Sequence, residues 1–414
     1  MHVEAEPFWT NEDAWAATRR PIERASALPA ACYSDGQFFA LEQDHVFGTS
    51  WVCVGVAEDV ANTGQVAVRD VAGTSVLITR NAEGELRGFL NACRHRGTEL
   101  KDEDCKVANT IRCPYHRWGY NLDGKLIATP RFDEAGVEAF DQAEFGLHPV
   151  RVAVFGCMLF VCLSEDTAPI EEWLGDLPER LAGYRLDEWS VRERRHININ
   201  ANWKLISENF QEYYHLAWVH PELAKVSRVE DHYRYQGAGM YCGQTTTPVS
   251  GDDRNDWLAM PPAKDLSRTD EESGRFVTLF PNVMLSVLPN HIALMILHPV
   301  SPGVTREELV FLLPPTGVDA TDEAFAQTRD FWVDVNNEDI GIVERGQRGL
   351  SNGGYTPGRL SPRFEEPLHR FHNMLADRFT NVQRIPEGDA SDAQDVLGSG
   401  VNPNPWKPEG AGEC

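Results

Sequence analysis

Two short segments, Asn91–Gly97 (NACRHRG) and Arg112–Trp118 (RCPYHRW), decide how this chain folds and what it holds. The first contains the pattern C-x-H, the second contains C-x2-H, and 17 residues separate His95 from Cys113. Each segment offers one soft thiolate and one imidazole, so two loops could close around a metal centre from two sides. The pattern predicts a centre with four protein ligands, namely Cys93, His95, Cys113 and His116.

This mixture of ligands favours a [2Fe–2S] cluster of the Rieske type over a zinc ion. In a Rieske cluster two cysteines hold one iron and two histidines hold the other, and the neutral imidazoles raise the reduction potential. Zinc also accepts two Cys and two His, but zinc modules more often pair like ligands as CxxC or HxxxH. Here each loop mixes one ligand of each kind. The chain has nine cysteines, and the others form no comparable pair and do not indicate a disulfide framework.

A second set of metal-binding residues lies in Asn202–Pro221 (NWKLISENFQEYYHLAWVHP), which contains the pattern E-x2-H-x4-H. We expect a helix over 203–219, in which Glu212 and His215 share one face. His220 would point about 140° away from His215 on a regular helix, so both reach one metal only if the helix is distorted or ends there. The proline that follows supplies that end, because the residue before a proline is driven out of helical geometry.

The third ligand of such a site is expected in Phe331–Gly349 (FWVDVNNEDIGIVERGQRG). On a helical wheel the apolar side chains gather on one face, Asp339 falls within that face, and Glu338 lies at its margin. A carboxylate on an apolar stripe is costly unless it is paired or bound to a metal. Two histidines and one carboxylate leave open positions on iron, as non-haem Fe(II) oxygenases require. We therefore predict a mononuclear iron held by His215, His220 and Asp339, with a capping or salt-bridging role for Asp339 as the alternative.

The sequence around these motifs indicates an α+β fold. We expect a helical arm at 1–46, a β-rich Rieske domain at 47–165, a connector at 166–190, a catalytic domain with an antiparallel sheet at 191–385, and a mobile tail at 386–414. The strands are inferred from short alternating or apolar runs that end at Gly, Asn or Asp. The apolar run Val152–Leu163 is too short to cross a bilayer and is predicted to be one buried strand. Helical periodicity covers 322–347 and 367–379, and Pro21 marks a second helix start in the arm.

The charge of the chain narrows the classes of function. With 38 Lys and Arg against 63 Asp and Glu, the net charge is −25. Such a surface repels phosphate backbones and anionic lipid, so neither a nucleic-acid nor a membrane role is expected. The N-terminus has no basic region followed by an apolar stretch, so we predict no secretory signal and a cytoplasmic location. Because GxGxxG and P-loop motifs are missing, we expect that this chain does not itself bind NAD(P)H.

Together these motifs resemble the α (oxygenase) subunits of Rieske non-haem iron oxygenases over roughly Phe47–Phe379. The resemblance implies a Rieske β domain followed by a helix-grip catalytic domain, with a [2Fe–2S] cluster, a mononuclear Fe(II) and O2 as co-substrate. It implies electrons from a separate NAD(P)H-dependent reductase of the ferredoxin or flavin type, and a ring of subunits, usually a homotrimer. In the family a carboxylate joins neighbouring subunits, so Glu212 would link His215 to His116 of the next subunit. Asn209, in the same segment, is a further candidate catalytic residue.

The bridging position carries Glu rather than the Asp typical of aromatic-ring dioxygenases, which resembles the branch that oxidises quaternary ammonium compounds such as carnitine and betaine. We therefore predict a monooxygenase that hydroxylates or N-demethylates a small polar substrate. Aromatic side chains near the iron motifs could face a cation, although aromatic stripes more often belong to the core. The candidates are Tyr213, Trp218, Phe331 and Trp332. Three alternatives stay open: an aromatic-ring dioxygenase or O-demethylase, a Rieske electron-transfer protein, and a zinc-stabilised binding module. Arg117 also stands where glycine often follows the second cluster histidine.

Overall fold

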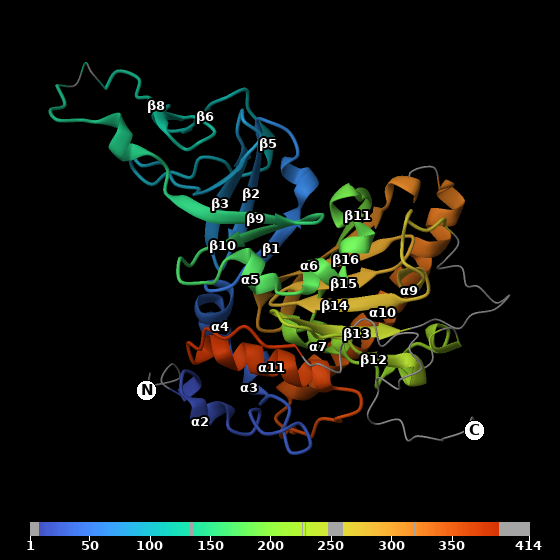
Figure 1. Cartoon of the computed structure of the whole chain (residues 1–414). Helices are drawn as coiled ribbons and strands as arrows, with labels where there is room; N and C mark the ends of the chain where they lie inside the picture. The colour runs from blue at the N-terminus through green and yellow to red at the C-terminus, as the bar shows by residue number, and fades with distance from the viewer. Residues whose placement is uncertain are drawn as a thin grey trace. The chain divides into compact units, whose positions relative to one another are not determined.

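The computed structural model describes residues 8–132, 134, 136–225, 227, 229–246, 260–317 and 320–388 (Figure 1). The chain divides into two compact units, one of Phe47–Thr167 and one of Met1–Val46 together with Ala168–Cys414. The first unit contains the Cys/His loops, and the second contains the E-x2-H-x4-H segment. The N-terminal arm thus groups with the catalytic part of the chain. Residues 389–414, which are most of the predicted tail, lie outside the described residues.

The Phe47–Thr167 unit contains two antiparallel sheets (Figure 1). The larger has the strand order β1-β10-β9-β4-β3-β2-β5, and the smaller has the order β6-β7-β8. The strands are β1 (Val52–Val56), β2 (Gln65–Val71), β3 (Thr74–Arg80), β4 (Leu86–Leu90), β5 (Cys105–Lys106), β6 (Ile111–Arg112), β7 (Gly119–Tyr120), β8 (Leu126–Ala128), β9 (Pro149–Phe155) and β10 (Met158–Cys162). The prediction of one strand over Val152–Leu163 is wrong. Gly156 takes a φ of 55° there, which lets the chain turn back between β9 and β10.

In its described residues the second unit has a seven-stranded antiparallel sheet in the order β11-β17-β16-β15-β14-β13-β12. Its strands are β11 (Ser190–Ile199), β12 (His232–Arg234), β13 (Tyr241–Thr246), β14 (Gly274–Leu279), β15 (Val283–Val287), β16 (Ile292–Ser301) and β17 (Val304–Leu313). Strands β12 and β13 were not predicted from the sequence. Directly paired residues point to the same face of an antiparallel sheet, so the register sets two rows of side chains next to each other. The first row is Gln244, Phe276, Ser286 and Ala293, and the second is Met284, Met295 and Leu309.

The three longest helices among the described residues are α7 (Trp203–Gln211), α10 (Asp322–Ser351) and α11 (Glu366–Phe379). The side chains of Asn202 and Thr321 cap the first turns of α7 and α10, as polar residues do at helix starts. The shorter helices are α2 (Glu12–Trp15), α3 (Ala31–Ser34), α4 (Gly36–Glu42), α5 (Ile170–Leu174), α6 (Leu177–Arg180), α8 (Leu216–Val219) and α9 (Arg268–Glu271). The helix expected to start at Pro21 is only a turn. Within the described residues, no helix combines the length and the apolar character needed to cross a membrane.

A buried ion pair ties the N-terminal segment to α7. The ammonium of Lys204 lies 2.5 Å from a carboxylate oxygen of Glu42, and both side chains are fully buried. The same ammonium faces the rings of Tyr33, Phe38 and Trp203. A buried charge is tolerated when it is paired, but removing one partner leaves the other without compensation in a site that water does not reach.

We expect Lys204→Met to lower the free energy of unfolding by about 3–5 kcal/mol, because Glu42 loses its counter-charge. The double variant Lys204→Met/Glu42→Leu should recover most of this loss, since apolar side chains of similar volume then replace the whole pair. Urea unfolding followed by circular dichroism measures both. Equal losses in the single and double variants would contradict the electrostatic account and point to packing.

Candidate metal centres

The four residues predicted to hold the cluster lie on two loops of the Phe47–Thr167 unit. In each loop the amide four residues after the cysteine donates a hydrogen bond to that cysteine's carbonyl, at 2.8 Å in the first and 3.2 Å in the second. Cys93 and Cys113 are both buried, and the rings of His95 and His116 lie 4.6 Å apart. Burial raises the pKa of the Cys93 thiol, and the neighbouring Cys113 adds to the rise. The two loops are thus built alike and bring their imidazoles side by side.

The surroundings of these residues fit a [2Fe–2S] cluster. Nδ1 of His95 is buried and has no hydrogen-bond partner among the residues that the structure describes, which suits a metal ligand. The hydroxyl of Tyr120 lies 3.4 Å from Sγ of Cys93 and accepts a hydrogen bond from the amide of Arg94, at 3.0 Å. The hydroxyl proton can therefore point to sulfur, where hydrogen bonds tune the potential of a cluster. The ring of Trp118 stacks on His95 at 4.8 Å and fixes its plane.

Arg117, which follows the second cluster histidine, has a left-handed backbone with a φ of 63°. This conformation costs a residue other than glycine roughly 1–2 kcal/mol, which explains why glycine suits the position. The loop keeps the left-handed turn with arginine in place, and the Arg117 side chain is exposed. The arginine therefore changes the surface beside the loop rather than the path of the loop.

The iron motif does not lie on one helix, so the prediction of a helix over 203–219 is wrong. Helix α7 ends at Gln211, Glu212 is extended with φ −115° and ψ 161°, and α8 begins after His215. The Glu212 carboxylate accepts hydrogen bonds from the amides of Tyr214 and His215, so it caps the turn that follows. Sequence periodicity does not show this break, because glutamate is also a good helix former.

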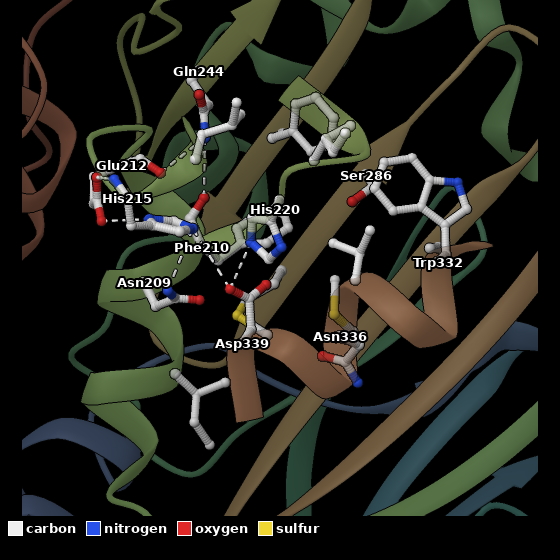
Figure 2. Close-up of a pocket in the computed structure, with 18 of the residues that line it drawn as sticks. Asn209, Phe210, Glu212, His215, His220, Gln244, Ser286, Trp332, Asn336 and Asp339 are labelled. Atoms are coloured by element: carbon white, nitrogen blue, oxygen red, sulfur yellow. Dashed lines mark hydrogen bonds and ion pairs between the residues drawn. The ribbon is translucent and has the colours of Figure 1, made fainter. Parts of the chain in front are cut away.

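The break directs both histidines toward one carboxylate. His220 ends α8 with φ −117° and ψ 70°, which is the non-helical geometry predicted for the residue before Pro221. Nε2 of His220 lies 2.8 Å from Oδ1 of Asp339, and Nε2 of His215 lies 3.5 Å from the same oxygen (Figure 2). Helix α10 carries Asp339. One ligand atom from each of the three side chains lies within 4.8 Å of the others, a spacing that lets them surround a single ion.

Further side chains orient the two imidazoles. Oε1 of Glu212 lies 2.5 Å from Nδ1 of His215, and Oε2 of Glu338 lies 2.7 Å from Nδ1 of His220. A carboxylate acceptor places the imidazole proton on Nδ1, which leaves the Nε2 lone pair for a metal. Glu338 therefore lies on the outer side of its histidine, away from Asp339. Nδ2 of Asn209 lies 3.4 Å from Nε2 of His215, next to the ligand atom itself.

The electrostatics between the three side chains favour a positive ion. Burial lowers the pKa of His215, but Asp339 and Glu212 outweigh it and raise the pKa to about 10. Burial raises the pKa of Asp339, but the imidazoles beside it bring the pKa below its ordinary value. Oδ1 of Asp339 is buried, and neither of its contacts with the rings has hydrogen-bond geometry. A carboxylate oxygen between two ring nitrogens fits the ligand set of a non-haem Fe(II) site.

An apolar pocket opens beside the three side chains, between α7, α10 and the sheet (Figure 2). Both rows of strand side chains contribute to its lining. Three aromatic rings of the described residues line it, with Phe276 lying 6.1 Å from Phe210 of α7 and 6.0 Å from Trp332 of α10. Apart from Glu212 and the three side chains that meet at Asp339, the polar residues that line the pocket are Asn209, Ser227, His232, Gln244, Ser286 and Asn336. The pocket is thus an apolar, partly aromatic cavity that adjoins the candidate metal ligands.

Of the four aromatic residues predicted to face a substrate, Trp332 lines the pocket and the other three do not. Tyr213 is buried one layer behind it, where its ring stacks on His232 and its hydroxyl donates to a backbone carbonyl. Phe331 packs in the same cluster as Tyr213. Trp218 has 83% of its surface exposed. The prediction that Tyr213, Phe331 and Trp218 face a substrate is therefore corrected. The break after α7 directs Tyr213 away from the pocket, and Phe331 and Trp332 are consecutive in α10 and so point to different faces of that helix.

Two aromatic residues of the pocket, Phe210 and Phe276, were not predicted from the sequence. Ile206, Asn209 and Phe210 all line the pocket and have the spacing of one helix face, a signal that was present in the sequence. Phe276 had no comparable signal, because only the pairing of β14 with β13 and β15 brings it beside Gln244.

The chain is similar to known proteins over most of its length. Residues 50–147 match the Rieske [2Fe-2S] domain, and residues 186–381 match the ring hydroxylating alpha subunit (catalytic domain). The glycine betaine monooxygenase oxygenase subunit of Chromohalobacter salexigens is 30% identical over 408 residues, which cover 90% of each chain. The carnitine monooxygenase oxygenase subunit of Escherichia coli (strain K12) is 28% identical over 370 residues, covering 86% of this chain and 95% of that one.

A solved structure of a quaternary ammonium Rieske monooxygenase gives a TM-score of 0.75 at 26% identity, over 89% of this chain and 98% of the other. The predicted fold class is thereby confirmed as α+β, with a Rieske domain and a catalytic domain built on an antiparallel sheet. The match to an oxygenase catalytic domain argues against a pure electron-transfer protein and against a zinc module. The chain belongs to the Rieske non-haem iron oxygenases, as an oxygenase (α) subunit.

Proposed function

We propose that this oxygenase is a monooxygenase that hydroxylates an N-methyl group of a small quaternary ammonium compound and so N-demethylates it. The observation that carries the proposal is the set of His215, His220 and Asp339 opening on a pocket lined by three aromatic rings. Aromatic faces attract cations, and most strongly where water is excluded. The names of the relatives, which refer to glycine betaine and carnitine, support the same class of substrate.

The proposed roles follow from the geometry. The [2Fe–2S] ligands are Cys93, His95, Cys113 and His116, and the Fe(II) ligands are His215, His220 and Asp339. When bound, the cluster carries single electrons and the non-haem iron activates O2. Glu212 and Glu338 keep the Nδ1 protons of the two histidines in place, so that each Nε2 stays available. Asn209 lies beside the His215 ligand atom, and the apolar lining limits water around the reacting methyl group.

The proposed reaction uses one O2, two electrons and two protons for each methyl group. One oxygen atom enters an N-methyl C–H bond, and the other leaves as water. The hydroxymethyl ammonium product then releases formaldehyde and a proton, which leaves the tertiary amine. The electrons come from NAD(P)H through a separate ferredoxin- or flavin-type reductase. Relatives named as oxygenase subunits support such a division of labour.

The proposed assembly is a ring of three identical chains in the cytoplasm. In such a ring Glu212 links His215 to His116 of the next subunit and completes the path of the electron. The 2.5 Å contact of Glu212 with His215 and its place at a break between helices support this role. Trp218, exposed between the two iron histidines, offers an aromatic side chain for the subunit contact.

A substrate screen tests the proposal. Anaerobically purified, iron-loaded protein with a surrogate reductase and NADH is supplied with choline, glycine betaine or carnitine, and in parallel with simple aromatic acids. We expect O2 uptake with at least one quaternary ammonium compound, together with one formaldehyde for each O2 consumed. Uptake with aromatic acids alone would leave the metal sites standing and overturn the substrate class in favour of a ring hydroxylase or O-demethylase.

A further inference from the structure

Glu307 in β17 is a buried carboxyl group that the proposed roles leave unused. None of its surface is exposed, and Oε1 accepts a hydrogen bond from Nδ2 of Asn336 at 2.8 Å. Oε2 is buried and has no hydrogen-bond partner within the described part of the chain. The residues opposite it on the two adjacent strands are Ile197 and Leu297, which are apolar. A carboxyl group in such surroundings is costly, and groups of this kind concentrate at functional sites.

Glu307 lies beneath the part of the pocket that adjoins the metal ligands. It is two residues before Leu309, so the two side chains share a face of β17 about 7 Å apart along the strand. Leu309 lines the pocket. Asn336 lines it as well and stands three residues before Asp339 on α10. Figure 2 shows both side chains extending from the same helix. Only the side chain of Asn336, which is hydrogen-bonded to Glu307 and lines the pocket, therefore needs to lie between a charge on Glu307 and the pocket.

The ionisation of Glu307 is poised to respond to a charge in the pocket. Burial raises the pKa of Glu307 to about 7, the hydrogen bond from Asn336 opposes the rise, and the negative charge of Asp339 adds to it. Burial therefore disfavours the ionised form of Glu307. A positive charge nearby stabilises the ionised form, by the same electrostatics that shift any buried carboxyl group.

We propose that Glu307 is the residue by which the pocket selects a positively charged head group over a neutral group of the same shape. This inference rests on the proposed function and deepens it. A quaternary ammonium has no N–H to donate, so aromatic faces and negative charge are what can recognise it. Glu212 and Asp339 also adjoin the pocket, but both already face imidazole rings. Glu307 adds negative charge from beneath without touching the substrate.

Two substitutions separate this role from a purely structural one, in which Glu307 only fastens β17 to α10. In Glu307→Gln the amide oxygen still accepts the hydrogen bond from Asn336, but the charge is gone. Glu308→Gln is the matched control one position away. Glu308 points to the opposite face of the sheet, 3.3 Å from Arg194 and 3.6 Å from His298.

The experiment compares two probes of the same shape by isothermal titration calorimetry on anaerobic, iron-loaded protein. The probes are choline and 3,3-dimethylbutan-1-ol, in which a neutral carbon replaces the charged nitrogen. We expect Glu307→Gln to lose about tenfold in affinity for choline, because one charge interaction across a partly screened site is removed. Its affinity for the alcohol should be unchanged, and Glu308→Gln should bind both probes as the unsubstituted protein does.

Each outcome decides a separate question. An unchanged choline-to-alcohol ratio in Glu307→Gln, with the cluster spectrum intact, overturns this inference and leaves the proposed function standing. If the unsubstituted protein binds none of choline, glycine betaine and carnitine, the proposed function fails and the inference fails with it. If Glu307→Gln does not fold, Glu307→Leu replaces it, because an apolar side chain removes the same charge without burying a polar group. The same fall in the ratio is then expected, and an unchanged ratio overturns the inference.

Discussion

Replacing Glu212 with glutamine is expected to leave both metal centres in place and to lower turnover by about 100-fold. The substitution keeps the size of the side chain, and an amide oxygen can still accept the hydrogen bond from Nδ1 of His215 or from the amides of the following turn. None of the three proposed iron ligands is itself replaced. What changes is the other end of the side chain. A carboxylate can accept hydrogen bonds from the N–H groups of two imidazoles at once, whereas an amide presents an NH2 group to one of them. The proposed link to His116 of the next subunit is therefore lost.

The measurement separates electron transfer from metal binding. Iron and acid-labile sulfide per chain, with the visible spectrum, report the two centres. Stopped-flow oxidation of the reduced cluster, with substrate and O2 present, reports the transfer. Glu338→Gln is the matched control, because Glu338 makes the equivalent contact to His220 at 2.7 Å. If Glu212 only orients its imidazole, the two variants should behave alike. A normal rate of cluster oxidation in Glu212→Gln would remove Glu212 from the electron path.

Most of the proposed metal-binding positions could be predicted from the sequence because they lie in short local motifs. Cys93 and His95 lie in one loop, and Cys113 and His116 lie in another, so their spacing alone limits the chemistry. Asp339 is distant from His215 and His220 in sequence. It could still be predicted, because burying a carboxylate on an apolar helix face costs free energy unless the carboxylate is paired or bound to a metal. The structure then brings it to 2.8 Å from Nε2 of one histidine and 3.5 Å from that of the other.

The substrate pocket could not be predicted in the same way, because its floor depends on strand register. Gln244, Phe276 and Ser286 come from β13, β14 and β15, and they meet only when the three strands pair as they do. A shift of one residue would turn each of these side chains to the other face. The helix break at Glu212 had a different cause. It depends on a side chain capping the backbone, which periodicity does not reveal, and it directs Tyr213 away from the pocket.

The buried environment of Glu307 could not be predicted from the sequence either. In the sequence Glu307 and Glu308 are neighbours with the same side chain, and only the alternation of β17 distinguishes them. One is fully buried next to Asn336, and the other forms ion pairs on the opposite face. Long-range pairing therefore decides which of two identical residues has its pKa raised by burial and which has its pKa lowered by its charged neighbours.

Asp339→Ala is expected to abolish turnover and to remove the mononuclear iron, while the cluster stays. The alanine leaves two imidazoles without the carboxylate that holds them to one centre, and a site with two neutral ligands binds Fe(II) weakly. Iron should fall from about three to about two per chain, since the cluster keeps its own two. The visible spectrum of the cluster and the content of acid-labile sulfide should be unchanged, because the cluster ligands belong to the other compact unit of the chain.

Glu338→Ala is the control that makes this prediction specific. Glu338 precedes Asp339 directly in α10, but its carboxylate binds Nδ1 of His220, on the side of the ring that faces away from Asp339. Its removal should leave the mononuclear iron in place and lower turnover by about 10–100-fold, as expected for a group that only orients a ligand. If instead Asp339→Ala kept its iron and Glu338→Ala lost it, the carboxylate ligand would have to be Glu338, and His220 would have to bind through Nδ1, the nitrogen that faces Glu338. The pair of variants therefore tests which nitrogen of His220 faces the metal as well as which carboxylate binds it.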